Sequence, residues 1–240
     1  MNSKTVRALT CLFVLSGVFT AGRSQAEDLN ASYSSMAPLD QYLMPDREAE
    51  IRLARSAAPP AISDHATVLV LTRQGYDVAA KGTNGFTCVV ERSWMSPFDS
   101  AEFWNPKMRG PVCYNPPAAR SILPYTVKTT EFALARLSKD QIKERILASV
   151  ASKGLPMPEP GAMSYMMSKG GNLGDAVGHW HPHLMFHIPK TDAASWGANL
   201  PSSPVELDTD HRDVPEPETI FMVPVGNWSD GTAAPVPIIR

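Results

Sequence analysis

Histidine is the residue whose spacing in this chain most clearly suggests chemistry. Four of the six histidines fall within nine residues, at His179, His181, His183 and His187. Side chains alternate between the two faces of a strand, so in an extended segment all four imidazoles lie on one face. Pro182 favours this extended form, because the residue before a proline is disfavoured in the α region. The same proline predicts that the strand lies at a sheet edge or beside a bulge.

Alternating histidines are competent metal ligands. Same-face neighbours on a strand lie about 7 Å apart, which allows two imidazoles to bind one ion through neutral ring nitrogens. The pair His181 and His183, joined by His179 or His187, therefore predicts a divalent-metal site with an open position for water. The site could be catalytic or not, and a catalytic site would make the protein a metal-dependent hydrolase or oxidoreductase.

The metal and its remaining ligands are open at this stage. Zinc suits imidazole ligands, whereas the methionines near the cluster, such as Met163 and Met185, would suit copper. We expect zinc or another divalent ion rather than copper-specific binding. His65 and His211 lie elsewhere in the sequence, and either could join the site.

The histidines also allow two interpretations without a metal. They could form a solvated patch on an exposed strand, or they could bind an anionic or aromatic ligand and transfer protons. The glycine-rich segment 169–175 before them is typical of a flexible connection. The acidic stretch 208–218, which contains Glu216 and Glu218, is typical of a solvated loop.

Residues 1–26 have the composition of a secretory signal peptide. Lys4 and Arg7 precede a mostly apolar run at 8–19, and the small residues Ser24 and Ala26 suit cleavage by signal peptidase. The run is shorter than the roughly 20 residues that span a bilayer, so we expect no transmembrane segment in the mature chain. The sequence therefore predicts an exported protein, either periplasmic or secreted.

The mature chain would keep two cysteines, Cys88 and Cys113. Disulfides persist in oxidising compartments, and no Cys-x-x-Cys spacing indicates a redox or zinc-ribbon motif. A disulfide that closes a loop of about 25 residues is the expected arrangement. A metal-binding pair and two free thiols are the alternatives.

Composition narrows the classes of function. Hydrophobic residues make up 43% of the 240 residues, and the formal net charge is −2 without a basic block. Nucleic-acid binding rests on clustered lysine and arginine, so we do not expect it. The alternative to an enzyme is a non-enzymatic envelope protein that binds a partner through surface histidines and an aromatic loop at Phe103 and Trp104. The substrate or partner itself stays unknown.

An α+β fold is expected to position the histidines. Three proline-free strands, separated by glycine-containing turns, predict an antiparallel meander at 66–71, 76–80 and 86–91. The sheet is expected to continue with strands at 162–168, 179–188 and 219–225.

One or two helices should pack on this sheet. The capping box of Ser138 and Gln141 starts a helix of about 15 residues, and a shorter helical piece is expected at 131–137. A further helix at 46–57 belongs to a lead-in segment at 27–60. Residues 61–240 are expected to form a single α+β domain.

Overall fold

The computed structural model describes residues 33–175, 178–207 and 215–235 of the chain. The predicted signal peptide at 1–26 and His211 lie outside the described residues.

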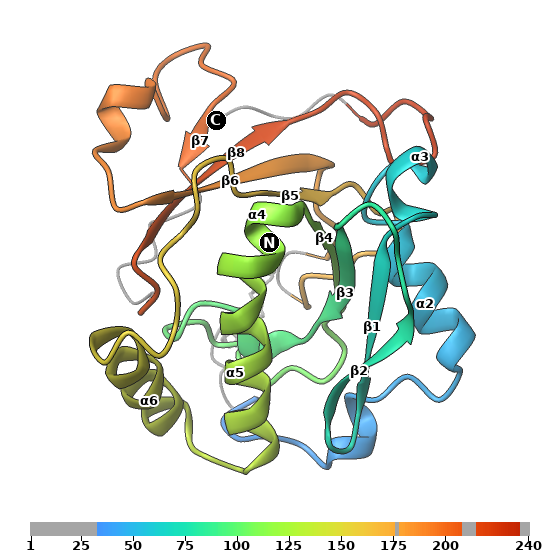
Figure 1. Cartoon of the computed structure of the whole chain (residues 1–240), viewed down its shortest axis with the longest axis vertical. Helices are drawn as coiled ribbons and strands as arrows, with labels where there is room; N and C mark the ends of the chain where they lie inside the picture. The colour runs from blue at the N-terminus through green and yellow to red at the C-terminus, as the bar shows by residue number, and fades with distance from the viewer. Residues whose placement is uncertain (1–32, 176–177, 208–214, 236–240) are drawn as a thin grey trace, which may run out of the picture.

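The described residues contain one eight-stranded sheet with the order β2-β1-β3-β4-β5-β6-β8-β7 (Figure 1). Its strands are β1 (Thr67–Thr72), β2 (Gly75–Ala80), β3 (Thr87–Glu91), β4 (Gly110–Tyr114), β5 (Met163–Met166), β6 (His183–Pro189), β7 (Glu206–Leu207) and β8 (Glu218–Pro224). Neighbouring strands are antiparallel except β1 and β3, which are parallel. The α+β class and the mostly antiparallel sheet are confirmed.

The predicted meander is wrong in its third strand. β1 and β2 form the expected hairpin, but β3 lies on the other side of β1 and runs parallel to it, pairing Val68 with Cys88. The connecting chain passes so close to the start of β1 that a Cβ on Gly82 would lie 2.2 Å from the backbone nitrogen of Thr67. The glycines after β2 therefore permit a crossing of β1, not a second hairpin.

Two strands were not predicted, and one prediction about position is wrong. β4 and β7 lie between the expected strands, and β4 forms although Pro111 lies within it. β6 lies between β5 and β8, so it is an interior strand and not an edge. Pro182 does not interrupt its hydrogen bonding because β6 begins one residue later, at His183.

The helices agree more closely with the sequence pattern. α2 (Arg47–Arg55) starts after Asp46, whose side chain accepts a hydrogen bond from the backbone of Glu48. α6 (Lys139–Ala151) starts at the predicted capping box, in which both hydrogen bonds form. The other helices are α3 (Pro60–Ser63), α4 (Pro116–Ser121), α5 (Leu123–Leu134) and the short 3-10 turns η1 (Leu39–Gln41), η2 (Ser93–Met95) and η3 (Ala193–Trp196). Thus α5 is longer than the helical piece expected at 131–137.

The two faces of the sheet are covered differently. On one face, Ala54 and Ala57 from α2 and the turn after it pack against Val68, Val90 and the two cysteines. On the other face lie α4 and α5 (Figure 1), and side chains of α4, α5 and η2 belong to the cores on that side. The small alanine side chains let α2 pack closely against β1, β3 and β4.

Cys88 and Cys113 form the predicted disulfide. They occupy directly opposite positions on β3 and β4, and both are fully buried beneath α2. The bond joins two neighbouring strands in register. It therefore fixes the centre of the sheet, on which the residues described below depend.

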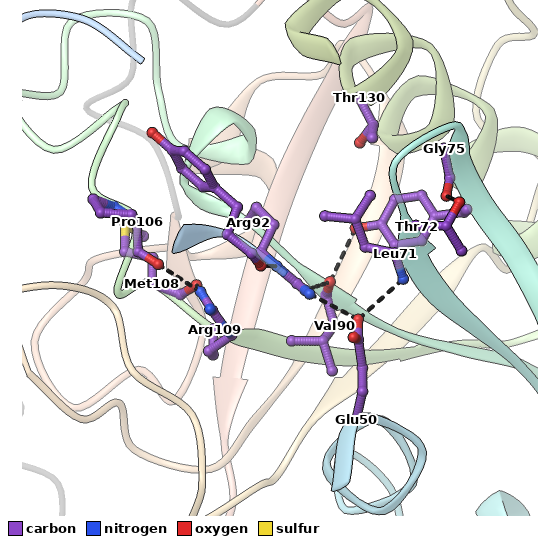
Figure 2. Close-up of polar contacts among 12 residues, drawn as sticks. Glu50, Leu71, Thr72, Gly75, Val90, Arg92, Pro106, Met108, Arg109 and Thr130 are labelled. Atoms are coloured by element: carbon purple, nitrogen blue, oxygen red, sulfur yellow. Dashed lines mark hydrogen bonds and ion pairs between the residues drawn. The ribbon is translucent and has the colours of Figure 1, made fainter. Parts of the chain in front are cut away.

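A buried ion pair between Glu50 on α2 and Arg92, the residue after β3, ties α2 to the sheet (Figure 2). The guanidinium of Arg92 donates to Glu50 Oε1 at 2.8 Å and to the Tyr42 carbonyl at 2.7 Å, and also to the Val90 carbonyl. The same Glu50 oxygen accepts from the backbone nitrogen of Leu71 at 3.1 Å. The pair is buried, and each guanidinium nitrogen of Arg92 donates a hydrogen bond. Arg92 therefore has a structural role.

Among the described residues, no helix combines the length and apolar character needed to cross a membrane.

Candidate functional site

A cavity of about 900 Å³ lies on the face of the sheet that α2 does not cover. Side chains of β3 to β8 that point to this face form its floor, because the pairing register places Glu91, Tyr114, Ser164 and His187 on the same side. Tyr125, Thr126 and Thr129 from α5 line it from above, together with the segment 94–100. Its volume is in the range of small-molecule sites.

Three side chains from neighbouring strands form a hydrogen-bonded chain in the cavity wall. The Nδ1 atom of His187 lies 2.9 Å from Glu218 Oε2, and its Nε2 atom lies 3.0 Å from Ser164 Oγ. Side-chain exposure is only 4% for His187 and 6% for Glu218, and Ser164 is fully buried. With Nδ1–H donating to the Glu218 carboxylate, Nε2 accepts from the Ser164 hydroxyl. The imidazole is therefore held in one orientation and one tautomer.

A second polar group lies beside this chain. Tyr114 and Thr126 donate hydrogen bonds of 2.5 and 2.8 Å to the same oxygen of Glu91. Burial raises the pKa of Glu91, although these two donors and the nearby His187 partly offset that effect. Burial and the neighbouring Glu91 carboxyl raise the pKa of Tyr114 well above its usual value. Tyr114 therefore stays a neutral donor, and its ring centroid lies 6.4 Å from that of His187.

Glu216 completes the acidic part of the cavity. It is half-buried, and burial raises the pKa of its carboxyl to about 7. The nearby carboxyls of Glu218 and Glu91 raise the pKa further, whereas a backbone hydrogen bond and Lys190 lower it. A carboxyl with a pKa near 7 exchanges its proton readily at neutral pH. Glu216 is therefore a candidate general acid or base in the wall of the cavity.

The four predicted histidines all line this one cavity, but they do not all share a strand. His183, Met185 and His187 point to one face of β6, as predicted. His179 and His181 lie before β6, so the single imidazole face expected over the whole segment is wrong. The strand begins only after Pro182, which has no backbone N–H to donate.

Most of the imidazole nitrogens outside β6 contact backbone carbonyls. His179 contacts the carbonyls of Trp180, at 2.7 Å, and Lys169, while His181 Nε2 lies 3.1 Å from the Val225 carbonyl. His183 Nδ1 lies 2.6 Å from the carbonyl of His181, and this side chain is buried. These contacts anchor the segment 179–183 above the sheet.

Within the described parts of the chain, no group of three or more His, Cys, Asp or Glu side chains is placed to hold a metal ion. His65 is not among the residues that line the cavity, and His211 lies outside the described residues. Metal binding by His179, His181, His183 and His187 therefore stays a prediction.

Sequence reasoning missed the carboxylates and the serine of this site. The expectation of a solvated acidic loop is wrong for Glu218, which starts β8 with a buried side chain, and for the half-buried Glu216. The alternation of Glu218 with Ile220 and Met222 on one strand face was the available signal. Ser164 and Glu91 carry no such signal, because each is one polar residue in an ordinary strand.

The aromatic loop considered for a partner-binding protein is not exposed. Phe103 and Trp104 are 1% and 5% exposed and belong to a hydrophobic core cluster. They do not supply the exposed aromatic surface that would have favoured a non-enzymatic interaction protein.

Comparison of the chain with protein-family models, with curated proteins and with solved structures gives no match.

Proposed function

We propose that the cavity is the active site of an enzyme that transfers protons to or from a small organic substrate, with His187 and Glu216 as the acid–base residues. The observation that supports this most directly is the chain Ser164–His187–Glu218 in the cavity wall, next to the carboxyls of Glu91 and Glu216. An imidazole held between a hydroxyl and a carboxylate is the arrangement of a general base.

Each residue of the site has a distinct role in this proposal. Glu218 and Ser164 position the His187 ring, and Glu218 stabilises the imidazolium that forms when His187 takes a proton. Glu216 gives or takes the second proton, since it has no competing hydrogen bond to another side chain among the described residues. Tyr114 remains a neutral donor beside Glu91.

A fragment screen by ligand-observed NMR tests whether the cavity is a binding site. We expect several fragments to compete for one site in the wild-type protein and to lose binding in Met222→Trp, which fills the cavity from β8. The matched control is Leu147→Trp, because Leu147 is 46% exposed on α6 and does not line the cavity. Fragments that bind both variants equally, or bind nowhere, would overturn the proposal.

The catalytic roles are tested on whichever chromogenic ester, amide or glycoside the wild-type protein turns over. Loss of the His187 base in His187→Gln should lower kcat by about two to four orders of magnitude while KM changes little. Glu216→Gln should remove the limb of the pH profile near neutrality. An unchanged kcat in both variants would exclude these residues from the chemistry.

Export to an oxidising compartment also belongs to this proposal. The Cys88–Cys113 disulfide supports it, since such bonds are rare in reducing compartments. The composition of residues 1–26 supports it independently.

Divalent-metal binding is the second candidate function, with zinc preferred to copper. One observation favours it, which is that all four predicted histidines and four glutamates line the same cavity. Elemental analysis of the purified protein and of a His181→Ala/His183→Ala double variant provides the test. A stoichiometric metal that disappears in the double variant would support the site, and equal metal content in both proteins would exclude these two ligands.

A further inference from the structure

The charge of the cavity wall is unbalanced. Five lining side chains are acidic, namely Glu91, Asp99, Glu206, Glu216 and Glu218. Arg92 is the one lysine or arginine among the described residues that line the cavity, and its guanidinium is already bound to Glu50 and two backbone carbonyls. Lys190 does not line the cavity, but it lies near Glu216 and lowers the pKa of that carboxyl, an effect smaller than the increases from burial and from the neighbouring carboxyls. Acidic side chains therefore outnumber basic ones at the cavity wall.

Three of the acids are close enough to affect one another. The carboxyls of Glu218 and Glu91 both raise the pKa of Glu216, and the carboxyl of Glu218 also raises the pKa of Glu91. Glu91 is held by Tyr114 and Thr126, and Glu218 by His187, whereas Glu216 has no side-chain donor among the described residues. A positive group placed among the three would relieve their repulsion and would give the Glu216 carboxyl a charged partner in addition to its backbone hydrogen bond.

The walls around these acids suit the apolar part of a cation. Several aromatic rings line the cavity, contributed by Trp94, Phe98, Tyr114, Tyr125 and Trp180. Aromatic faces attract cations as well as apolar groups. The methionines among the lining residues add polarizable side chains that adapt to a ligand's shape.

Two buried polar atoms in the lining residues lack a hydrogen-bond partner. They are the hydroxyl of Thr129, which is 2% exposed, and the indole nitrogen of Trp180, which is 6% exposed. A helical threonine commonly bonds to the carbonyl one turn earlier, but Thr129 does not. Buried polar groups without partners are rare in folded proteins, so both atoms point to a bound molecule that would satisfy them.

From these observations we infer that the cavity binds an organic cation, an amine with an apolar body, whose positive group lies among Glu91, Glu216 and Glu218. The hydroxyl of Thr129 can accept a hydrogen bond from an ammonium group, and the Trp180 indole can donate to an oxygen elsewhere on the ligand. This inference rests on the proposed function and specifies the substrate class of the same site.

Isothermal titration with matched ligands tests the inference by binding alone, without any assay of turnover. The probes are phenethylamine, phenethyl alcohol and hydrocinnamate, together with octylamine, octanol and octanoate, at about pH 8, where free imidazole is neutral. In each set the amine should bind the wild-type protein at least about tenfold more tightly than the alcohol, and the carboxylate should bind most weakly.

Charge-neutral variants assign the effect to the cavity. Glu216→Gln should weaken binding of the amines about tenfold and leave binding of the alcohols unchanged. Glu144→Gln is the matched control, because it removes the same charge from an exposed position on α6 and should change neither.

The outcomes separate this inference from the proposed function. If alcohols or carboxylates bind as tightly as the amines and lose binding in Met222→Trp, the inference of a cationic ligand is overturned. The proposal that the cavity is an active site would then still stand. If Glu216→Gln and Glu144→Gln weaken the binding of amines equally, the effect comes from the net charge of the protein and not from the cavity, and the inference is overturned. Absence of binding by all six probes would also overturn it, while the fragment screen would decide the cavity separately.

Discussion

At the scale of single residues, Glu216 is expected to make the folded protein less stable as the pH rises. Its pKa is about 7 in the folded protein against 4.5 for a free glutamate side chain, so the folded state binds more protons between these values. Stability therefore falls through this window and is constant, for this group, above and below it. Because the side chain is half-buried, we expect a total effect of roughly 1–2 kcal/mol, below the full linkage value.

Urea unfolding at several pH values measures this effect as the difference in the free energy of unfolding between wild type and Glu216→Gln. Glutamine does not titrate, so the variant should gain stability relative to wild type between about pH 4.5 and pH 7. The exposed Glu144→Gln variant should show a constant difference over the same range. If the difference in unfolding free energy between wild type and Glu216→Gln is also constant with pH, folding does not raise the pKa of the Glu216 carboxyl.

The residues of the cavity could be predicted from the sequence only where they are clustered along the chain. Clustering along the chain was enough to identify the four histidines as candidate site residues, and all of them line the cavity, namely His179, His181, His183 and His187. Ser164 is brought to His187 by strand pairing, since it lies opposite Met185, two residues away on the same face of β6. No local pattern reveals which serine pairs with which histidine across a sheet, so Ser164 could not be detected from the sequence.

At the scale of elements, helices were predicted more accurately than strand neighbours. The capping box at Ser138 fixes the start of α6 through local hydrogen bonds. The position of β3 depends instead on where the chain goes after Gly82, and the choice between a second hairpin and a crossing of β1 is made by tertiary packing. β4 was missed because Pro111 and the surrounding prolines are typical of loops.

The disulfide gives a prediction for the pair of strands that it joins. Reduction of Cys88–Cys113 reopens a loop with a sequence separation of 25 residues, which should lower the free energy of unfolding by roughly 3 kcal/mol on the chain-entropy model. Urea unfolding of the same protein with and without a reductant, followed by tryptophan fluorescence, measures the change.

A double variant provides the control for this experiment. Cys88→Ala/Cys113→Ala cannot form the bond, so its midpoint should not respond to the reductant. If the wild-type midpoint is equally insensitive while thiol titration shows complete reduction, the disulfide does not contribute to stability as expected.

At the scale of the whole molecule, one face of the sheet carries residues that stabilise the fold and the opposite face carries the residues proposed for chemistry. The face under α2 holds the disulfide among small apolar side chains, and the opposite face holds Glu91, Ser164, His187 and Glu218. Buried polar side chains cost stability unless they are hydrogen-bonded, and these residues are partnered mainly by one another. A cavity of this kind is formed jointly by several strands and helices, which is why its carboxylates could not be predicted from any one segment.

Export is the last property of the whole molecule that can be tested directly. If residues 1–26 are a signal peptide, the full chain expressed in a bacterium should be recovered from the periplasm with Glu27 as its first residue. Intact mass should also show a protein two hydrogens lighter than the dithiol form, because Cys88 and Cys113 are bonded. A variant in which Phe13→Arg and Val14→Arg interrupt the apolar run should stay in the cytoplasm with its leader uncleaved and its thiols free. Recovery of unprocessed wild-type protein from the cytoplasm alone would contradict export, and the disulfide would then need an oxidant other than its compartment.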